Sequence, residues 1–194
     1  TERLIKLGNI HVHVDLIAGL PYESYEIFAR SFDKVYSLGA DMLQLGFLKV
    51  LAGTPIYNQI EAHGIKYRSH APYEVISTDY ISAEELVRLK MIENMVDIYY
   101  NRGGFEDTID FLIGSCGKGP FGFYEMLADY YYEKGYQNRD RKKEDQYRIL
   151  LEFSGTLPGG VREKTRELLE GDMKRNTNPE IFNRFLRKGW ELTR

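Results

Sequence analysis

Residues 10–23, near the start of the chain, alternate strictly between two kinds of side chain. One parity carries only apolar residues of the kind that pack against a helix. As far as residue 17 the other parity carries two imidazoles, a carboxylate and one apolar residue, namely His11, His13, Asp15 and Ile17, and it then reaches Gly19 and Pro21. Because successive side chains of a strand point to opposite faces, the pattern predicts a β-strand with one packed face and one face open to chemistry. Strands of this kind line the lumen of a parallel barrel.

The segments after this strand alternate between helix and strand. Residues 24–38 place apolar side chains at three- and four-residue steps, which predicts a helix, and residues 41–50 read as a second strand. This order predicts a parallel βαβ unit with a right-handed crossover. Thr54 and Pro55 then suit the N-cap and the first residue of a short helix that Gly64 ends.

A parallel sheet of two strands is not expected to be stable alone, because parallel sheets need their faces and edges covered. Only residues 73–78 offer a further strand in this chain. The chain also begins without a methionine, and residues 1–7 read as the last turns of a helix that ends at Gly8. We therefore expect a fragment of a longer protein, whose remaining strands lie before Thr1.

From residue 82 onward the pattern is helical. Ser82 and Glu85 have the spacing of a capping box, which predicts a helix from there to about residue 101. Glycines separate further predicted helices at about 105–115, 120–134, 143–154, 160–175 and 179–188. The predicted fold class is α/β and then mostly α. Residues 1–78 form the last βαβ portion of a partial (β/α) barrel, and residues 79–194 form a helical C-terminal domain.

The bulk composition excludes several classes of protein. The net charge of −3 gives no electrostatic basis for binding nucleic acid or an anionic membrane. No run approaches the roughly 18 apolar residues that a membrane span requires, and no signal peptide is visible. The single cysteine, Cys116, excludes an internal disulfide and fits a reducing cytoplasm. No histidine lies near Cys116 in the sequence, so it lacks the setting of an activated nucleophile.

Two imidazoles and a carboxylate on one strand face, His11, His13 and Asp15, could ligate a divalent metal and serve a metal-dependent hydrolase. The residue after Asp15 is Leu16, whereas metallo-β-lactamase-like hydrolases have a histidine there. The two histidines also occupy the N-terminal half of the strand, away from the end at which barrels catalyse. We therefore predict packed or rim histidines and no metal site, with only His63 and His70 as further imidazoles.

Residues nearer the carboxyl end of the strand are better placed to bind a ligand. The carboxylate of Asp15 could accept hydrogen bonds from a ribose hydroxyl or an ammonium group, or from neighbouring structural donors. Ile17 could wall a flat ring or simply fill a barrel layer. Gly19 permits close approach of a ligand, although glycine is common at such turns for backbone reasons. On the second strand, Gln44 faces inward by parity, and Lys49 lies near the mouth, where it could bind an anion or remain an ordinary surface lysine.

Three pieces of the chain resemble the late barrel strands of radical S-adenosylmethionine enzymes. They are residues 15–21 (DLIAGLP), residues 41–45 (DMLQL) and residues 53–55 (GTP), in the expected order and with a helix after the first. The first piece is most similar to the corresponding strand of oxygen-independent coproporphyrinogen oxidase and its relatives. This resemblance covers residues 1–64.

The rest of the chain resembles a tail found on radical enzymes that carry an N-terminal cobalamin-binding domain. The similarity lies in residues 73–80, in the helix that contains residues 89–93 and ends at residues 99–101, and in residues 120–125. Proteins with this tail are often labelled Mg-protoporphyrin IX monomethyl ester oxidative cyclase. The two resemblances imply an oxidoreductase or methyltransferase-like enzyme acting on a small-molecule substrate.

The resemblance also implies roles for particular residues. Asp15 would help hold S-adenosylmethionine, Ile17 would pack on its adenine, and Leu48 would wall the same ring. Gly19 completes the predicted set of cofactor-binding residues. The family binds a [4Fe–4S] cluster through three cysteines, and this chain has one. The cluster and any cobalamin would therefore be held upstream, and the fragment would be inactive alone. A non-catalytic interaction module remains a further alternative, and the exposed barrel edge could make the fragment dimerise.

Overall fold

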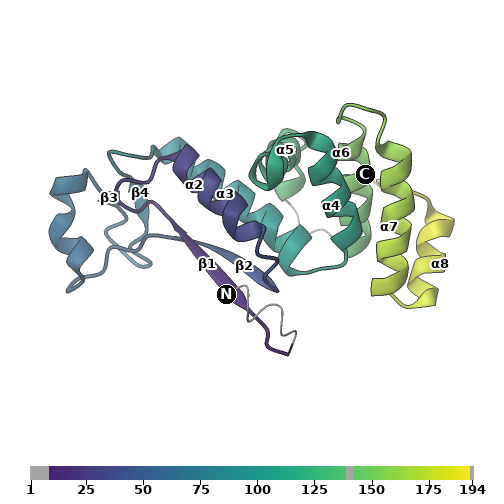
Figure 1. Ribbon diagram of the computed structural model, residues 1–194, viewed down its shortest axis with the longest axis horizontal. Helices are drawn as coiled ribbons and strands as arrows, with labels where there is room; N and C mark the ends of the chain where they lie inside the picture. The colour runs from purple at the N-terminus through teal and green to yellow at the C-terminus, as the bar shows by residue number, and fades with distance from the viewer. Residues whose placement is uncertain (1–8, 139–141, 193–194) are drawn as a thin grey trace. The chain divides into compact units, whose positions relative to one another are not determined.

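The computed structural model describes residues 9–138 and 142–192 (Figure 1). The predicted helix end at residues 1–7 and the predicted stop at Gly8 lie outside the described residues. Contacts divide the chain into two units, Thr1–Asp97 and Ile98–Arg194. Helix α3 falls in the first unit by this division. The predicted domain boundary between residues 78 and 79 stays a prediction, because contacts alone do not define evolutionary domains.

The first unit begins with the predicted βαβ element. Strands β1 (His13–Ala18) and β2 (Met42–Phe47) are parallel, and helix α2 (Tyr25–Tyr36) connects them (Figure 1). Ser24 forms the N-cap of α2, where its hydroxyl accepts a hydrogen bond from the amide of Ile27. The predicted strand, helix and strand are therefore confirmed, with ends that differ by a few residues.

One face of the strand pair is packed and the other is open. Helix α2 contacts β1, and its Phe28 and Phe32 are fully buried, as is Leu43 of β2. Helix α3 (Ala83–Val96) contacts β2. On the opposite face of β1 the side chains of His13, Asp15 and Ile17 are exposed, and they alternate with the half-buried Val14 and Leu16 and the buried Ala18. The alternation in the sequence thus correctly predicts a packed face and an open one.

The region after β2 differs from the prediction. Residues 73–78 do contain a strand, β4 (Val75–Ser77), but it pairs antiparallel with the short strand β3 (Lys66–Tyr67). The amide of Val75 donates to the carbonyl of Leu48 at 2.8 Å, and Lys49 and Glu74 form an antiparallel bridge. The hairpin therefore continues the end of β2 and adds no parallel strand. No closed barrel is present in the described residues, so the partial barrel stays a prediction.

The short helix at residue 55 also differs from the prediction. It consists of two 3₁₀ segments, η1 (Pro55–Gln59) and η2 (Glu61–His63), and Gly64 ends them in the left-handed conformation, as predicted. Pro55 occupies the first position, but the hydroxyl of Thr54 donates backward to the carbonyl of Leu51 at 2.6 Å and does not cap the helix. In the 3₁₀ geometry the amide of Tyr57, which the Thr54 side chain would cap, already donates to the carbonyl of Thr54 at 3.1 Å.

The capping box of α3 is confirmed in both directions. The hydroxyl of Ser82 accepts from the amide of Glu85 at 3.2 Å, and the carboxylate of Glu85 accepts from the amide of Ser82 at 2.7 Å. The helix runs into a π-turn, η3 (Asp97–Asn101), which ends it close to the predicted residue.

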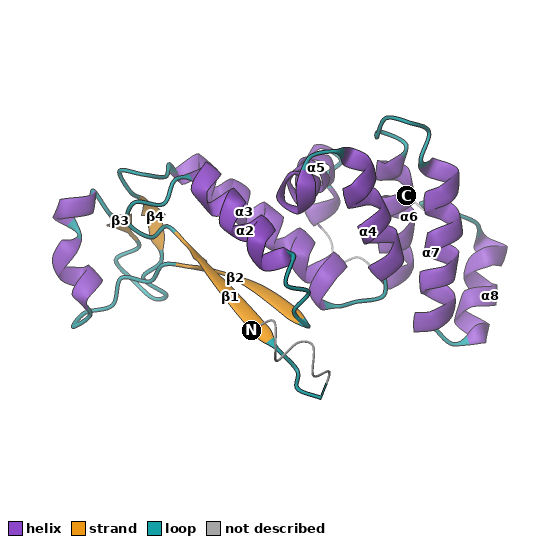
Figure 2. Ribbon diagram, viewed as in Figure 1, coloured by secondary structure: helices purple, strands orange, loops and turns teal. Residues whose placement is uncertain are grey.

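In its described part the second unit consists of helices and the loops between them, without a strand (Figure 2). All five helices predicted after residue 104 are confirmed: α4 (Glu106–Cys116), α5 (Gly119–Glu133), α6 (Lys143–Ser154), α7 (Arg162–Asn176) and α8 (Pro179–Lys188), with the turn η4 (Tyr136–Asn138) before α6. Aromatic side chains dominate its core. The buried hydroxyl of Tyr99 bonds the hydroxyl of Tyr131 and donates to the carbonyl of Gln146 at 3.1 Å, which satisfies a polar group that would otherwise be costly to bury. Within the described residues, no helix has the length and apolar character that a membrane crossing needs.

Helix α4 is capped from a distant helix. Its N-cap residue, Phe105, has no side-chain oxygen to offer. The carboxylate of Asp172 on α7, which is fully buried, accepts instead from the amide of Thr108 at 3.0 Å, from its hydroxyl at 2.6 Å and from the amide of Asp107 at 3.4 Å. Arg175, one turn along α7, donates to the carboxylates of both Asp107 and Asp172. A buried anion thus satisfies the free amides of a helix N-terminus.

Glu23, at the end of the turn after β1, provides a test of stability against pH. Its Oε2 atom is buried and has no hydrogen-bond partner among the described residues, and burial raises the pKa of this carboxyl. A raised folded-state pKa makes stability fall as pH rises from the unfolded-state pKa to the folded-state pKa.

We predict that Glu23→Gln matches the parent below about pH 4 and is more stable at neutral pH. The gain should be less than about 1 kcal/mol, because solvent reaches the rest of the side chain. Urea unfolding at several pH values measures it, and a variant less stable than the parent at neutral pH would contradict the prediction.

Candidate functional site

A hollow of about 520 Å³ lies along β1 and β2. Its lining combines polar and apolar groups: Asp15, Leu16, Ile17, Gln44, Gly46, Phe47, Leu48, Lys49 and Glu74. The volume lies within the range of about 300–1,000 Å³ that is usual for small-molecule sites. Three of the four predicted cofactor-binding residues, Asp15, Ile17 and Leu48, are therefore brought together around one space.

The register of the two strands explains which side chains meet. Asp15 lies opposite Gln44, and Ile17 lies opposite Gly46. Facing residues of neighbouring strands project to the same side of the sheet, so a carboxylate and an amide stand together at one end of the hollow. Gly46 has no side chain to fill the space beside Ile17, which is 46% exposed. The hollow thus has a polar end and an apolar end on the open face of the strand pair.

Leu48 closes the apolar end. Its amide donates to the carbonyl of Ala18 at 2.9 Å, which continues the ladder past β2 and fixes the position of the side chain. The side chain is 9% exposed, on the same parity as Gln44 and Gly46. Ile17 thus offers exposed apolar surface, whereas Leu48 is buried and only borders the hollow, and their contact with a cofactor stays a prediction.

A charged group from a later segment, Glu74, lines the hollow and is itself paired. Glu74 reaches it through the bridge with Lys49, and the ammonium of Lys90 on α3 bonds the carboxylate of Glu74 while standing 4.2 Å from the centroid of the Phe47 ring. One turn along α3, burial raises the pKa of Glu93, with the nearby carboxylates acting in the same direction. The sequence analysis does not predict that Glu74 lines the hollow or that Lys90 bonds Glu74. Their segments are far apart in the chain, and such a contact leaves no local pattern in the sequence.

Gly19 lies against β4 and is not part of the lining. Its φ is +87°, and a Cβ added there would stand 2.7 Å from Cγ1 of Val75. Packing against Val75 therefore explains why this position is glycine. The predicted contact of Gly19 with a cofactor stays a prediction.

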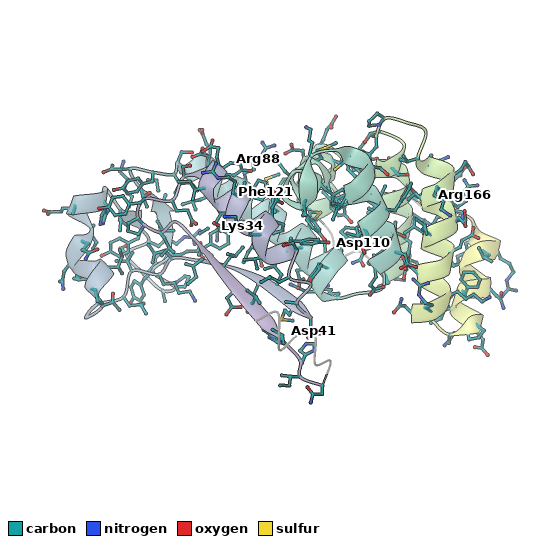
Figure 3. All side chains as sticks on the ribbon, viewed as in Figure 1. Lys34, Asp41, Arg88, Asp110, Phe121 and Arg166 are labelled. Carbon is teal, nitrogen blue, oxygen red and sulfur yellow. The ribbon has the colours of Figure 1, made fainter. Side chains whose placement is uncertain are left out.

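The two histidines predicted to share a strand face pair locally, but β1 begins at His13 and His11 lies before it. The rings of His11 and His13 pack edge-to-face at 4.8 Å, and Nδ1 of His11 stands 3.7 Å from a carboxylate oxygen of Asp41. The other oxygen of Asp41 accepts from the amide of Val12 at 2.7 Å. Figure 3 shows Asp41 at the end of the strand pair from which β2 begins. In the described residues no three His, Cys, Asp or Glu side chains converge in a way that could hold a metal ion.

The remaining histidines and the cysteine have structural surroundings. His63 is buried, bonds the hydroxyl of Tyr80 through Nδ1 at 3.1 Å and packs edge-to-face on Tyr22. His70 contacts the carbonyl of Ala71. The thiol of Cys116 donates to the carbonyl of Ile113 at 3.2 Å, one turn back in α4. None of these contacts resembles an activated nucleophile or a ligand set.

The described residues thus define an α/β unit with a mixed polar and apolar hollow on its open strand face, and a separate helical unit. The chain belongs to the family described as "Protein of unknown function (DUF4080)", which matches residues 61–192, more than half of its length. A comparison with curated proteins found no match. The family match begins in η2, so β1, α2, β2 and most of the hollow lie before it.

Proposed function

We propose that this chain is the C-terminal part of a radical S-adenosylmethionine enzyme and that the hollow along β1 and β2 is one wall of its S-adenosylmethionine pocket. The observation that carries the proposal is the convergence of Asp15, Ile17 and Leu48 on one space. The similarity of residues 15–21, 41–45 and 53–55 to radical-enzyme strands supports it. The matched family covers the part of the chain that resembles the tail of such enzymes.

Each lining group has a chemical task in this proposal. The carboxylate of Asp15 accepts hydrogen bonds from ribose hydroxyls or the ammonium group, and these charge-assisted bonds are stronger than neutral ones. The amide of Gln44, its neighbour across the strands, both donates and accepts, and so adds direction to the same contact. Ile17 and Leu48 hold the flat adenine between apolar surfaces and exclude water from it. The chain thereby binds and orients the cofactor.

The reactive cofactors are proposed to be held by a preceding part of a longer polypeptide. A [4Fe–4S] cluster of this family needs three thiolates, and Cys116 is the one cysteine of the chain, so these residues do not fit the cluster. Held by that preceding part, such a cluster would supply reducing electrons, and this chain would contribute only binding and orientation of S-adenosylmethionine. Cobalamin binding is proposed for the same preceding part. The substrate is proposed to be a small molecule.

Binding of S-adenosylmethionine tests the role of the hollow. In the full-length protein that contains this chain, we predict that Asp15→Ala raises the Kd for S-adenosylmethionine about tenfold or more, since a hydrogen bond to a charged group contributes roughly 1.5–3 kcal/mol. Isothermal titration calorimetry under anaerobic conditions measures the change.

A matched control is Glu61→Ala, which removes an exposed carboxylate that does not line the hollow. We expect this variant to keep the parental Kd. Equal affinities of the parent and Asp15→Ala would remove Asp15 from the pocket. Absence of any binding by the full-length protein would favour the interaction module.

A further inference from the structure

The helical unit contains a second pocket, of about 450 Å³, which the proposed function does not use. It lies between the first turns of α7 and the end of α8. Its lining contains three cationic side chains, Arg162, Arg166 and Lys188, together with Gly189, Trp190 and Glu191. Figure 3 shows Arg166 on α7. Three cations and one carboxylate leave the pocket with a net positive charge, and Trp190 adds an aromatic surface.

Arg166, which lines this pocket, has one guanidinium donor without a partner. Its Nε atom is buried and has no hydrogen-bond partner among the described residues. The nearest carboxylate contact that it makes is long, 3.8 Å from Nη1 to Oε2 of Glu163. A guanidinium presents its donors in a planar fork that matches two oxygens of a phosphate or carboxylate. The loosely paired Arg166 beside two further cations therefore points to an oxyanion as the ligand.

The wall that carries Lys188 and Trp190 is held in place by buried contacts. The amide of Gly189 donates to the carbonyl of Phe185 at 3.0 Å, and its carbonyl accepts from Nε of the buried Arg148 at 3.1 Å. The guanidinium of Arg148 stacks 4.4 Å from the centroid of the Phe185 ring, and Trp190 packs edge-to-face on the same ring at 4.9 Å. The pocket is thus preorganised, which lowers the entropic cost of binding.

We propose that this pocket binds a small organic anion, with Arg166 and Lys188 holding its phosphate or carboxylate group and Trp190 contacting its planar body. Arg166 supplies the directional fork, and Lys188 supplies a mobile charge. Arg162, at the start of α7, adds attraction for the anion, and Glu191 disfavours ligands with a second cationic group. The volume of the pocket is enough for a ligand well beyond a bare inorganic ion.

The fluorescence of Trp190 gives a direct readout, because it is the only tryptophan of the chain. The probes are adenosine 5′-monophosphate, benzoate, inorganic phosphate and uncharged adenosine. We expect a saturable change of tryptophan emission with at least one of the two planar anions, a weaker effect with inorganic phosphate and none with adenosine. Adenosine 5′-monophosphate and benzoate distinguish a phosphate ligand from a carboxylate ligand.

Charge-removing variants complete the test. Arg166→Gln and Lys188→Gln should each weaken the binding at least tenfold, since each removes a charge-assisted contact. Lys164→Gln, on the same helix but paired with Glu167 at 2.9 Å, should leave it unchanged. Circular dichroism checks folding, and Lys188 is exposed enough for its variant to remain folded. The proposal is overturned if no anion produces a saturable change up to about 1 mM, or if all three variants bind as the parent does.

Discussion

Asp172→Ala is expected to lower the free energy of unfolding by about 3 kcal/mol or more, the largest effect that we predict for a single side chain. The substitution removes a buried carboxylate that accepts from the amide and the hydroxyl of Thr108 and from the amide of Asp107. It therefore leaves the N-terminus of α4 without its cap, and it leaves buried hydrogen-bond donors without an acceptor. It also removes one of the two carboxylates that bind Arg175. Urea denaturation followed by circular dichroism measures the loss.

Two further variants show whether the loss comes from this contact. Thr108→Val combined with Asp172→Ala should lower the free energy of unfolding by less than the sum of the single changes, because the two side chains share a hydrogen bond.

Asp110 lies on the same helix, and its pKa is raised by burial and by the charges of Asp107, Asp172 and Glu106.

Stability should therefore fall as pH rises from the unfolded-state pKa of Asp110 to its folded-state pKa. Asp110→Asn should be more stable than the parent at neutral pH and equal to it in acid. A similar loss of stability for Asp110→Asn and Asp172→Ala would contradict the specific role of Asp172.

Gly19→Ala is expected to destabilise the first unit by about 3 kcal/mol, through backbone strain and a steric clash together. The φ of +87° is unfavourable for alanine, and its Cβ would lie 2.7 Å from Cγ1 of Val75, which is itself buried. Gly39→Ala provides a matched control, because Gly39 also has a positive φ, +66°, but no atom within 4 Å of the added Cβ. It should show the strain alone, about 1–2 kcal/mol.

Shortening the side chain of Val75 separates the backbone strain of Gly19→Ala from its steric clash. We expect Val75→Ala to recover part of the stability that Gly19→Ala loses, so that the double variant is more stable than the sum of the two single effects predicts. Thermal unfolding of the four proteins gives the coupling energy. Equal losses for Gly19→Ala and Gly39→Ala, with no coupling to Val75, would show that close packing on β4 does not require the glycine.

Local signals in the sequence predicted the helices and the βαβ unit. The features that the sequence did not predict depend on contacts between residues far apart in the chain. Ser82 and Glu85 lie within one turn, so their capping box was predictable and is confirmed. The cap that Asp172 provides joins residues 64 positions apart, and nothing near Phe105 in the sequence indicates it. Strand β3 is only two residues long, too short to show a period of two. The strand expected in residues 73–78 is present as β4, but its antiparallel pairing with β3 was not predicted.

The candidate site also has a part that local sequence signals predicted and a part that depends on distant contacts. Parity along β1 predicted that Asp15 and Ile17 share a face, and the parallel register brought Gln44 and Gly46 beside them. Glu74 and Lys90 reach the same region from segments that the sequence could not place. The pocket around Trp190 was missed altogether, because it forms only when the start of α7 meets the end of α8.

The most direct test of the proposed function is whether the full-length protein that contains this chain releases 5′-deoxyadenosine from S-adenosylmethionine on reduction. The protein would be purified without oxygen, reconstituted with iron and sulfide, and mixed with S-adenosylmethionine and dithionite, and the products would be measured by mass spectrometry. We predict 5′-deoxyadenosine from the parent and less from Asp15→Ala at low S-adenosylmethionine concentration. A protein that retains no iron after reconstitution and forms no 5′-deoxyadenosine would contradict the assignment to radical S-adenosylmethionine enzymes.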